Sequence, residues 1–420
     1  MKQLHKYRTR TLLLIILVVV ITGCYDRERI NPFDPNSDTQ AEPFNLRVES
    51  SGNRVTLAWS PVDSPDLTGY NIYRALQGNT LSKFASVADS VSRFTDTDVT
   101  NLTPYVYSVS ANGNEDETFL ATPDTIIPGP TRYWALSDGA QSMLHLSHDG
   151  FHLNESISIF IAPELIIAPG FRNLVLIYDR YEGALYWYQP GSEPSLIVSE
   201  LDQVLDIFKT AGSSKIFMLR QDSTVVAVDI ESQTTQTVRF SGKLTAGAVG
   251  SNGGLWIAED NSLLWMSSGN YQKVRFYEVP EESEITSIAD AGDDLMFLAL
   301  REAGKVVILQ NGNKEGEITE VDNPVQIEYS DLDNSLWIRS YNSSLGIYRI
   351  YRYQGEESTR MFTGAGSLYD IAVNPVDGTC LTADYDNERF YRIQPDGAVQ
   401  SHGSFGGKVH ELVVQRLPSD

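Results

Sequence analysis

The chain has 420 residues, 41% of them hydrophobic and 21% charged, so it can fill two or three globular domains and is not a disordered protein. Its formal charge of −23 argues against a nucleic-acid partner, because phosphate binding needs clustered lysine and arginine. Two cysteines, Cys24 and Cys380, are too few for a disulfide framework.

The amino terminus has the features of an export signal. Basic residues without any acid precede Leu12–Ile21, an apolar run that is too short for a membrane span of about 20 residues. The sequence Ile-Thr-Gly-Cys at 21–24 follows directly and resembles the bacterial lipobox, which is cut before its acylated cysteine. The resemblance implies a lipoprotein signal peptide over residues 1–23 and lipid attachment at Cys24.

Attachment at Cys24 would hold the mature chain on a membrane outside the cytoplasm, since each buried acyl CH₂ contributes about 0.8 kcal/mol. Tyr25, and not an aspartate, follows the cysteine, which favours the outer membrane of the cell envelope. The periplasmic and the surface-exposed orientation both stay open. Residues 24–41 are polar and proline-containing, which is typical of an extended tether, and they lack the glycine of a calcium loop.

Short strands with frequent turns over residues 42–125 predict a β-sandwich. Val55, Leu57 and Trp59 alternate onto one face, and Gly-Tyr-Asn-Ile-Tyr-Arg at 69–74 begins the next strand. Together with Leu-Thr-Pro-Tyr-Val-Tyr-Ser-Val-Ser-Ala at 102–111, these segments resemble fibronectin type III domains. The resemblance implies a core position for Trp59 and a tyrosine corner at Tyr105. It implies a spacer or a protein- or glycan-binding module, without catalysis.

A repeat of about 41 residues fills the chain from residue 130 to residue 416. One apolar strand recurs at spacings of 41, 42, 39, 40, 41 and 44 residues, beginning at Tyr133, Leu174, Ile216, Leu255, Leu295, Leu336 and Cys380. Glycine, aspartate and asparagine clusters precede most copies, as tight hairpins require. Four short strands per repeat predict a β-propeller, so the whole chain is expected to be all-β.

The last repeat, Leu368–Gln400, shows strand, turn, strand, polar turn, strand, turn and strand most clearly. Its Asn-Pro-Val-Asp-Gly, Ala-Asp-Tyr-Asp-Asn and Pro-Asp-Gly segments resemble NHL-like and YVTN-like propellers of bacterial envelope proteins. The first repeat lacks an innermost strand, and Val409–Val414 has the character of that strand. We therefore expect the carboxy terminus to close a ring of seven blades, with six blades as the alternative.

Turns between the second and third strands of the repeats are the predicted binding surface, because they share one face of a propeller. Mixed charge and exposed tyrosine in these turns suit recognition of a protein or a polysaccharide. The candidate ligand-binding residues are Arg180, Tyr181, Asp260, Arg301, Tyr341, Tyr385 and Asp386.

Signatures of catalysis or of a bound cofactor are missing from the sequence. No nucleophile elbow, His-Glu-x-x-His motif or phosphate loop occurs, and no catalytic residue is assigned. His145, His148 and His152 flank a turn and are expected to point in different directions, so we predict no metal site there. The acidic charge still leaves open the binding of a divalent cation.

These features predict a lipid-anchored envelope protein whose propeller binds protein or polysaccharide without catalysis. The alternative is a metal-dependent hydrolase, lactonase or lyase acting at the channel mouth, since related propellers use carboxylates scattered over several blades. A third interpretation is a purely structural part of a larger envelope assembly.

Overall fold

The computed structural model describes residue 33 and residues 45–114, 116–138, 143–168, 173–209, 214–251, 253–279 and 283–417. The predicted signal peptide, Cys24 and nearly all of the tether lie outside the described residues. Every regular element of the described chain is a β-strand. No helix long and apolar enough to cross a membrane occurs within these ranges.

The described chain falls into two compact units, of which the first holds most of strands β1 to β7. A three-stranded sheet has the order β1-β2-β5, and a four-stranded sheet has the order β4-β3-β6-β7. The strands are β1 (Arg47–Ser51), β2 (Arg54–Ala58), β3 (Gly69–Leu76), β4 (Ser82–Ala88), β5 (Arg93–Asp96), β6 (Tyr105–Asn112) and β7 (Asp124–Ile126).

The core of this unit contains the aromatic residues that its sequence pattern points inward. Trp59 and Tyr105 are both buried, and the Trp59 ring lies 5.3 Å from that of Tyr70. The buried Tyr107 hydroxyl donates a hydrogen bond of 2.7 Å to Asp96, so the polar end of this side chain is also satisfied.

The second unit consists of seven four-stranded antiparallel sheets formed by the described residues from Thr131 onward. The first sheet contains β8 (Thr131–Asp138), β9 (Met143–Leu146), β10 (Leu153–Ile157) and β35 (Lys408–Arg416). The second contains β11 (Pro163–Ile167), β12 (Val175–Asp179), β13 (Ala184–Tyr188) and β14 (Ser195–Val198), and the third β15 (Val204–Lys209), β16 (Lys215–Arg220), β17 (Thr224–Asp229) and β18 (Thr234–Arg239).

The remaining sheets repeat the same order of four consecutive strands. The fourth contains β19 (Leu244–Val249), β20 (Leu255–Glu259), β21 (Ser262–Met266) and β22 (Lys273–Glu278), and the fifth β23 (Ile285–Asp290), β24 (Leu295–Leu300), β25 (Lys305–Gln310) and β26 (Asn313–Ile318). The sixth contains β27 (Asn323–Ser330), β28 (Ser335–Asn342), β29 (Ile347–Gln354) and β30 (Glu357–Thr363), and the seventh β31 (Leu368–Val373), β32 (Cys380–Asp384), β33 (Arg389–Ile393) and β34 (Val399–Gly403).

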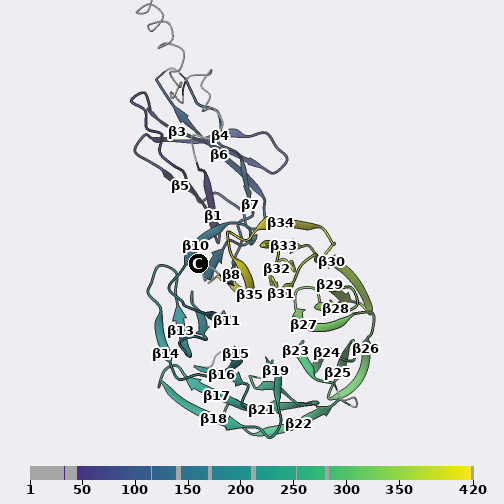
Figure 1. The fold of residues 1–420 in the computed structure, drawn as a ribbon. Helices are drawn as coiled ribbons and strands as arrows, with labels where there is room; N and C mark the ends of the chain where they lie inside the picture. Colours follow the sequence, from purple (N-terminus) through teal and green to yellow (C-terminus); the bar gives the residue numbers. More distant parts are fainter. Residues whose placement is uncertain are drawn as a thin grey trace, which may run out of the picture. The chain divides into compact units, whose positions relative to one another are not determined.

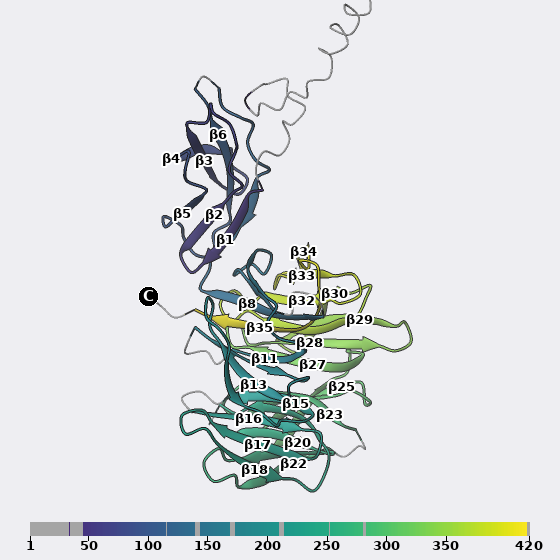
Figure 2. The same ribbon diagram turned by 60° about the vertical axis from the view of Figure 1, so that its left-hand side comes forward.

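The seven sheets are arranged in a ring around a common centre (Figure 1), and Figure 2 shows the same ring turned by 60°. Their innermost strands are β35, β11, β15, β19, β23, β27 and β31, each of which contacts the innermost strands of both neighbouring sheets. β35 pairs with β8 along its length, from Lys408 opposite Asp138 to Arg416 opposite Thr131. The prediction that the carboxy-terminal strand completes the first sheet is therefore confirmed.

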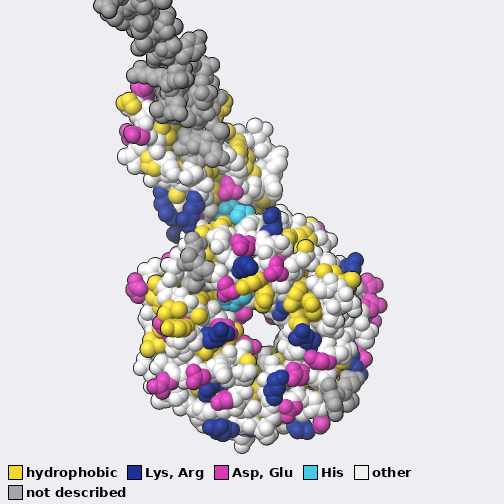
Figure 3. Space-filling model, viewed as in Figure 1, with side chains coloured by type: hydrophobic (Ala, Val, Ile, Leu, Met, Phe, Trp, Pro, Cys, Tyr) yellow, Lys and Arg dark blue, Asp and Glu magenta, His cyan; other side chains and the backbone are white. Residues whose placement is uncertain are grey.

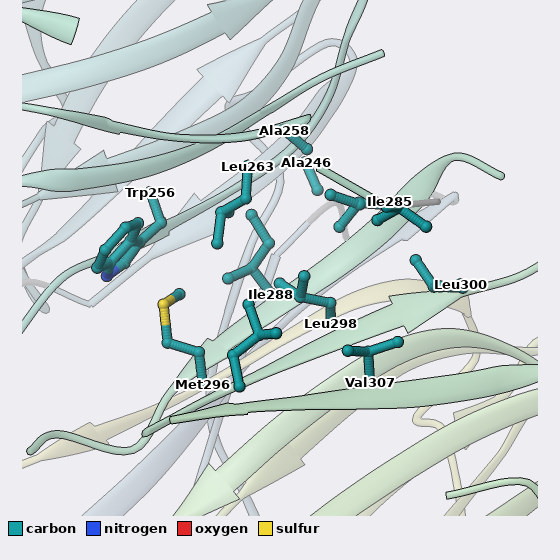
Figure 4. Close-up of a cluster of buried hydrophobic side chains, with 12 residues drawn as sticks. Ala246, Trp256, Ala258, Leu263, Ile285, Ile288, Met296, Leu298, Leu300 and Val307 are labelled. Carbon is teal, nitrogen blue, oxygen red and sulfur yellow. The ribbon is translucent and has the colours of Figure 1, made fainter. Parts of the chain in front are cut away.

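The recurring apolar segment of the sequence forms the second strand of every sheet, and its side chains fill the spaces between sheets. Between the fourth and fifth sheets, Trp256 lies in a cluster with Met296 and Leu298 (Figure 4). The turns agree with their sequences as well. Asn311 and Gly312 join β25 to β26 with φ values of 51° and 75°, the left-handed conformation that a tight hairpin needs.

A buried polar network joins the seventh sheet to the first, where the ring closes. His148 is fully buried, with Nδ1 against the Thr131 hydroxyl and Nε2 3.3 Å from Asp377. Asp377 also accepts a hydrogen bond of 2.6 Å from Arg392, while Asn374 donates to Thr131 over 2.9 Å. The bond between Asn374 and Thr131 connects segments that are 243 residues apart in the chain.

Candidate functional site

The innermost strands begin at the same level of the ring, which defines one end of its central channel. In each sheet the register between the first and second strands shifts near the start of the first strand, and the shift leaves one residue bulged. In three of the sheets the bulged side chain reaches a carbonyl at or near the start of the next innermost strand. Thr245 donates to Ile285 over 2.8 Å, Thr286 donates to Pro324 over 3.1 Å, and His410 lies 3.1 Å from the Pro163 oxygen.

The turns between second and third strands lie at this end, because the second strand of each sheet runs antiparallel to the first. We call this end the channel mouth. Figure 3 shows an opening at the centre of the ring with acidic and basic side chains around it. The seven candidate residues come from turns or strand ends of the second, fourth, fifth, sixth and seventh sheets.

Several of these candidate residues already have partners. Arg180 pairs with Glu164 over 3.1 Å, whereas the neighbouring Tyr181 is 75% exposed. Asp260 accepts a hydrogen bond of 2.9 Å from the Lys243 amide, in a turn where its own φ is 53°. Its carboxylate therefore stabilises a turn, and of these three exposed side chains only that of Tyr181 has no described partner in a hydrogen bond or ion pair.

Of Asp386 and Arg301, the first has a hydrogen-bond partner and the second is exposed. Asp386 accepts a hydrogen bond of 2.8 Å from the Ser367 amide, which fixes the turn after β32. Arg301 is exposed on the turn after β24. Burial lowers the pKa of Arg339, and the positive charge of Arg301 adds to that effect. Only Arg301 of these two carries a charge that is free of a described hydrogen bond.

Tyrosine rings gather at the mouth over the sixth and seventh sheets. Tyr341 lies 4.9 Å from Tyr348, and Tyr369 lies 4.7 Å from Tyr385, measured between ring centroids. We call these four residues the tyrosine arc. Tyr369 is 48% exposed, so the arc presents an aromatic surface to solvent. Sequence reasoning identified Tyr341 and Tyr385 and missed their partners.

Charged groups contact Tyr385, the member of the arc nearest to the ring closure. The Tyr385 hydroxyl donates a hydrogen bond of 2.6 Å to Asp138, and this bond raises the pKa of Tyr385 to about 12. Lys408 lies 5.0 Å from the centroid of the same ring, in a cation–π contact. His410 Nδ1 is 3.5 Å from Asp138, so β35 and the turn after β32 both contact this carboxylate of β8.

Below the mouth, carboxylates from the innermost strands of four sheets lie near one another. Asp206, Asp370 and Glu411 occupy the same position in their innermost strands, directly after the bulge, where the sixth sheet has Gln326. Glu328 lies two residues further along β27. We call Asp206, Glu328, Asp370 and Glu411 the carboxylate ring.

Burial raises the pKa values of the four side chains in the carboxylate ring. Desolvation raises the pKa of Asp206 to about 7 and that of Glu328 to about 8, and repulsion from Asp370 adds to both. The pKa of Asp370 is raised to about 6, again by burial, although Arg339 opposes the shift. Burial together with Asp370 raises the pKa of Glu411 well above its usual range. The ring therefore retains protons near neutral pH.

Gln326 and Arg339 connect the ring to the tyrosine arc. Gln326 donates to Asp370 and accepts a hydrogen bond of 2.9 Å from Arg339 Nε. Arg339 Nη1 donates to the Leu368 carbonyl over 2.6 Å, and its guanidinium carbon lies 5.9 Å from the Tyr348 ring. Asp370 accepts a further hydrogen bond of 2.6 Å from the Leu412 amide. The ring is thus held by both neighbouring sheets.

Metal ligands are not assembled anywhere in the described ranges, where no three His, Cys, Asp or Glu side chains are placed to hold an ion. The three histidines of the first sheet point to different partners. His145 stacks on Trp134 at 4.5 Å, His148 is buried at the ring closure, and His152 lies 3.0 Å from Asp149. The expectation that these histidines diverge is confirmed.

The carboxylate ring was missed because its members come from separate repeats and form no local motif. A signal is nevertheless present in the sequence. When the repeats are aligned on their innermost strands, one column holds Leu165, Asp206, Ala246, Ser287, Gln326, Asp370 and Glu411. Carboxyl and amide side chains at this position of otherwise apolar strands indicate that the position does not face the hydrophobic core.

Comparisons by sequence reach only part of this chain. No protein-family model matches it. An amylopullulanase of Thermoanaerobacter thermohydrosulfuricus is 43% identical over 101 residues, which are 22% of this chain and 7% of that protein. An amylopullulanase of Thermoanaerobacterium saccharolyticum is 42% identical over 84 residues, 19% of this chain and 6% of that protein. The chain therefore spans less than a tenth of the length of these curated relatives.

Comparisons by structure cover about two thirds of the chain. A catalytically inactive virginiamycin B lyase from Staphylococcus aureus, with quinupristin, has a TM-score of 0.51 at 13% identity and matches 65% of this chain and 89% of that one. A functionally unknown protein from Desulfotomaculum acetoxidans has a TM-score of 0.55 at 11% identity, over 68% and 99% of the two chains. A Lactobacillus plantarum protein has a TM-score of 0.55 at 10% identity over the same shares. At such identities the likeness shows the fold alone, which is propeller-like.

Proposed function

We propose that this chain is a lipid-anchored protein of the bacterial cell envelope that binds a polysaccharide at the channel mouth of its propeller-like unit, without catalysis. The tyrosine arc is the observation that carries this proposal. Its aromatic rings are adjacent and partly exposed, and polar groups surround them, which suits the apolar faces and hydroxyl groups of sugar rings.

The local similarity to amylopullulanases supports a polysaccharide over a protein ligand, because those proteins are named for pullulan, a polysaccharide. The similarity covers a small part of each relative, so it supports the class of ligand and not the enzymatic activity.

The same proposal includes a finer architecture. We take the seven sheets as blades of a seven-bladed propeller, supported by the contacts that close the ring of innermost strands. We take residues 42–125 as a fibronectin type III domain, supported by the sheet orders β1-β2-β5 and β4-β3-β6-β7 and by buried Trp59. A sandwich of this kind would act as a spacer between the lipid at Cys24 and the propeller.

Binding to immobilised pullulan tests the proposed ligand. The full-length chain, solubilised in a detergent without a sugar headgroup, should bind, and Tyr341→Ala with Tyr385→Ala should weaken binding about tenfold or more. Tyr353→Ala, on β29 outside the arc, is the matched control and should bind like the parent chain. Equal binding by the arc variant would contradict the site. Failure to bind pullulan and a panel of other polysaccharides would favour a protein ligand.

Labelling with palmitate tests the anchor. The parent chain should incorporate label and lose its signal peptide, whereas Cys24→Ser should do neither, because the thiol is the acylated group of the lipobox that residues 21–24 resemble. Cys380→Ser is the control, since that thiol is buried, and it should label normally. Labelling of the Cys24→Ser chain would contradict lipid attachment there.

A hydrolase or lyase at the channel mouth is the second candidate, and the carboxylate ring is the observation that favours it. Carboxyl groups with pKa values raised toward neutrality suit general acid–base chemistry. Metal analysis of the purified chain separates the two candidates. One tightly held divalent ion per chain, lost in Asp370→Asn, would favour the enzyme over the binding protein.

A further inference from the structure

A pocket of about 440 Å³ lies on the second sheet, at the end away from the channel mouth. Its described lining comes from Asn173 and Leu174 before β12, from Trp187 and Tyr188 in β13, and from the turn that follows β13. β12 runs from this pocket to the turn with Arg180, so a whole strand of about 16 Å separates the pocket from the mouth. The pocket is therefore a different site from the tyrosine arc.

Hydrogen bonds fix the walls of this pocket before any ligand binds. The Asn173 amide oxygen accepts a hydrogen bond from Arg132, whose Nε donates to Gln415 over 2.7 Å. The Tyr188 hydroxyl donates to Glu155 over 2.9 Å, which fixes its ring. The pocket is thus preorganised, and rigid walls reduce the entropy cost of binding.

The turn after β13 is equally constrained. Ser192 donates to the Gln189 carbonyl through both its amide, over 3.0 Å, and its hydroxyl, over 2.7 Å. Gly191 supplies the left-handed conformation with φ of 76°. Gln189 and Glu193 are exposed on this turn, so their polar ends are available to a ligand in the pocket.

The indole of Trp187 gives the pocket its apolar surface. One part of the half-buried ring packs against the hydrophobic cluster between the second and third sheets, and the ring also lines the pocket. Aromatic surface beside amide, hydroxyl and carboxylate groups matches a ligand that has an apolar ring face and a polar edge.

Charge narrows the class of ligand. None of the described lining residues is a lysine, an arginine or a histidine, and Glu193 contributes a negative charge. A phosphate, sulfate or uronate group would find no counter-ion among them. We propose that this pocket binds a neutral saccharide of one or two rings, with a sugar face on Trp187 and hydroxyl groups on Gln189, Glu193 and Asn173.

Calorimetric titration of the full-length chain tests the pocket, again in a detergent without a sugar headgroup. The probes are maltotriose, cellotriose and xylotriose, with trigalacturonate as the anionic comparison. At least one neutral probe should bind saturably, and Trp187→Ala should weaken that binding about tenfold or more. Gln189→Ala, on an exposed turn, should weaken it about threefold without affecting the fold.

Trp265 provides the matched control, because it occupies in β21 the strand position that Trp187 occupies in β13. Trp265→Phe should bind the neutral probe like the parent chain, and so should the tyrosine-arc variant. A binding isotherm that is unchanged in both Trp187→Ala and Gln189→Ala would overturn the proposal for this pocket. The proposal would also be overturned if no neutral probe bound saturably. Tighter binding of trigalacturonate than of every neutral probe would also overturn it.

The two sites can fail separately. Loss of pullulan binding only in the tyrosine-arc variant supports the mouth and says nothing for the pocket, whereas loss of trisaccharide binding only in the Trp187 and Gln189 variants supports the pocket. The inference about the pocket therefore does not depend on the function proposed for the mouth.

Discussion

At the scale of single residues, the carboxylate ring shows how a fold can oppose the ordinary ionisation of its side chains. Glu328 accepts a hydrogen bond of 2.7 Å from the Val373 amide, which by itself favours the charged form. Burial and repulsion from Asp370 outweigh that bond and raise the pKa of Glu328 from 4.5 to about 8. Desolvation is thus stronger than one backbone hydrogen bond at this position.

Glu328→Gln should make stability less dependent on pH. Because its pKa is higher in the folded than in the unfolded chain, the folded state binds more protons between these values, and stability falls as pH rises from about 4.5 to 8. The variant should therefore melt about 3 °C higher than the parent at about pH 8.5 and at nearly the same temperature at about pH 5. Thermal melts followed by circular dichroism measure both.

Glu317→Gln is the control for this change. Hydrogen bonds from Lys305 and Lys314 hold the pKa of Glu317 below its usual value, so its charge favours the folded state. This variant should not gain stability at the higher pH. A melting temperature of Glu328→Gln that moves equally at both pH values would show that the carboxylate is not protonated in the folded chain.

Arg339→Met should cost about 3 kcal/mol of unfolding free energy, because it leaves Asp370 and Glu411 without the cation that opposes their burial. Adding Asp370→Asn should recover part of that loss, since the amide oxygen can still accept from the Leu412 amide. Urea denaturation measures the unfolding free energies of the parent chain, Arg339→Met and the double variant.

The exposed pair of Arg275 with Glu278, at 2.9 Å, provides a comparison for this substitution. Arg275→Met should cost less than about 1 kcal/mol, since water screens that pair. A double variant no more stable than Arg339→Met alone would mean that the guanidinium acts through packing and not through the ring.

At the scale of elements, the carboxy-terminal strand does more than complete a sheet. β35 pairs with β8, contacts β11 and β31, and carries Glu411 of the carboxylate ring and His410 of the mouth. Without it, β8 would present an unpaired edge, and the seventh sheet would lose the Leu412 amide that Asp370 binds. One strand therefore serves closure and the candidate site together.

Ending the chain after Gly407, which removes β35, should give aggregated or partly unfolded protein in the detergent in which the parent chain is folded. The reason is the exposed edge of β8 and the loss of the buried Val409 and Leu412 side chains. Size-exclusion chromatography and circular dichroism detect both effects. A chain ending at Leu417 keeps the strand and should behave like the parent. A monomer that melts at the parent temperature without β35 would show that closure comes from other contacts.

At the scale of the whole molecule, each of the two units has its own core. Trp59, Tyr70 and Tyr107 are buried in the first, and interlocking clusters between successive sheets fill the second. A unit with a separate core can fold by itself.

Calorimetry of the full-length chain should accordingly show two unfolding transitions, and a fragment of residues 127–420 should retain one of them at the same temperature. The fragment of residues 45–126 should show the other. A single transition in the full chain, absent from both fragments, would mean that the units depend on one another for stability.

Much of the fold could be predicted because its signals are local. Strand alternation, turn residues such as Asn311-Gly312 and the period of the second strand are all present in short windows of the sequence. Even the closing strand was predictable, since Val409–Val414 has the apolar pattern that the first repeat lacks. Of the candidate site, Tyr341 and Tyr385 were found because the strand pattern predicts turns there, although Tyr341 lies within β28, which is longer than predicted, and only Tyr385 lies in a turn.

Only the tertiary structure decided which side chains meet. The carboxylate ring assembles four residues from separate repeats, and the tyrosine arc pairs Tyr369 with Tyr385 and Tyr341 with Tyr348. The strand pattern does not predict the pocket at Trp187. Trp265 has the same position in its own strand, but it does not line this pocket. The sequence by itself determined the sheets through local pattern, and closure of the ring then set the distances between residues that no local pattern connects.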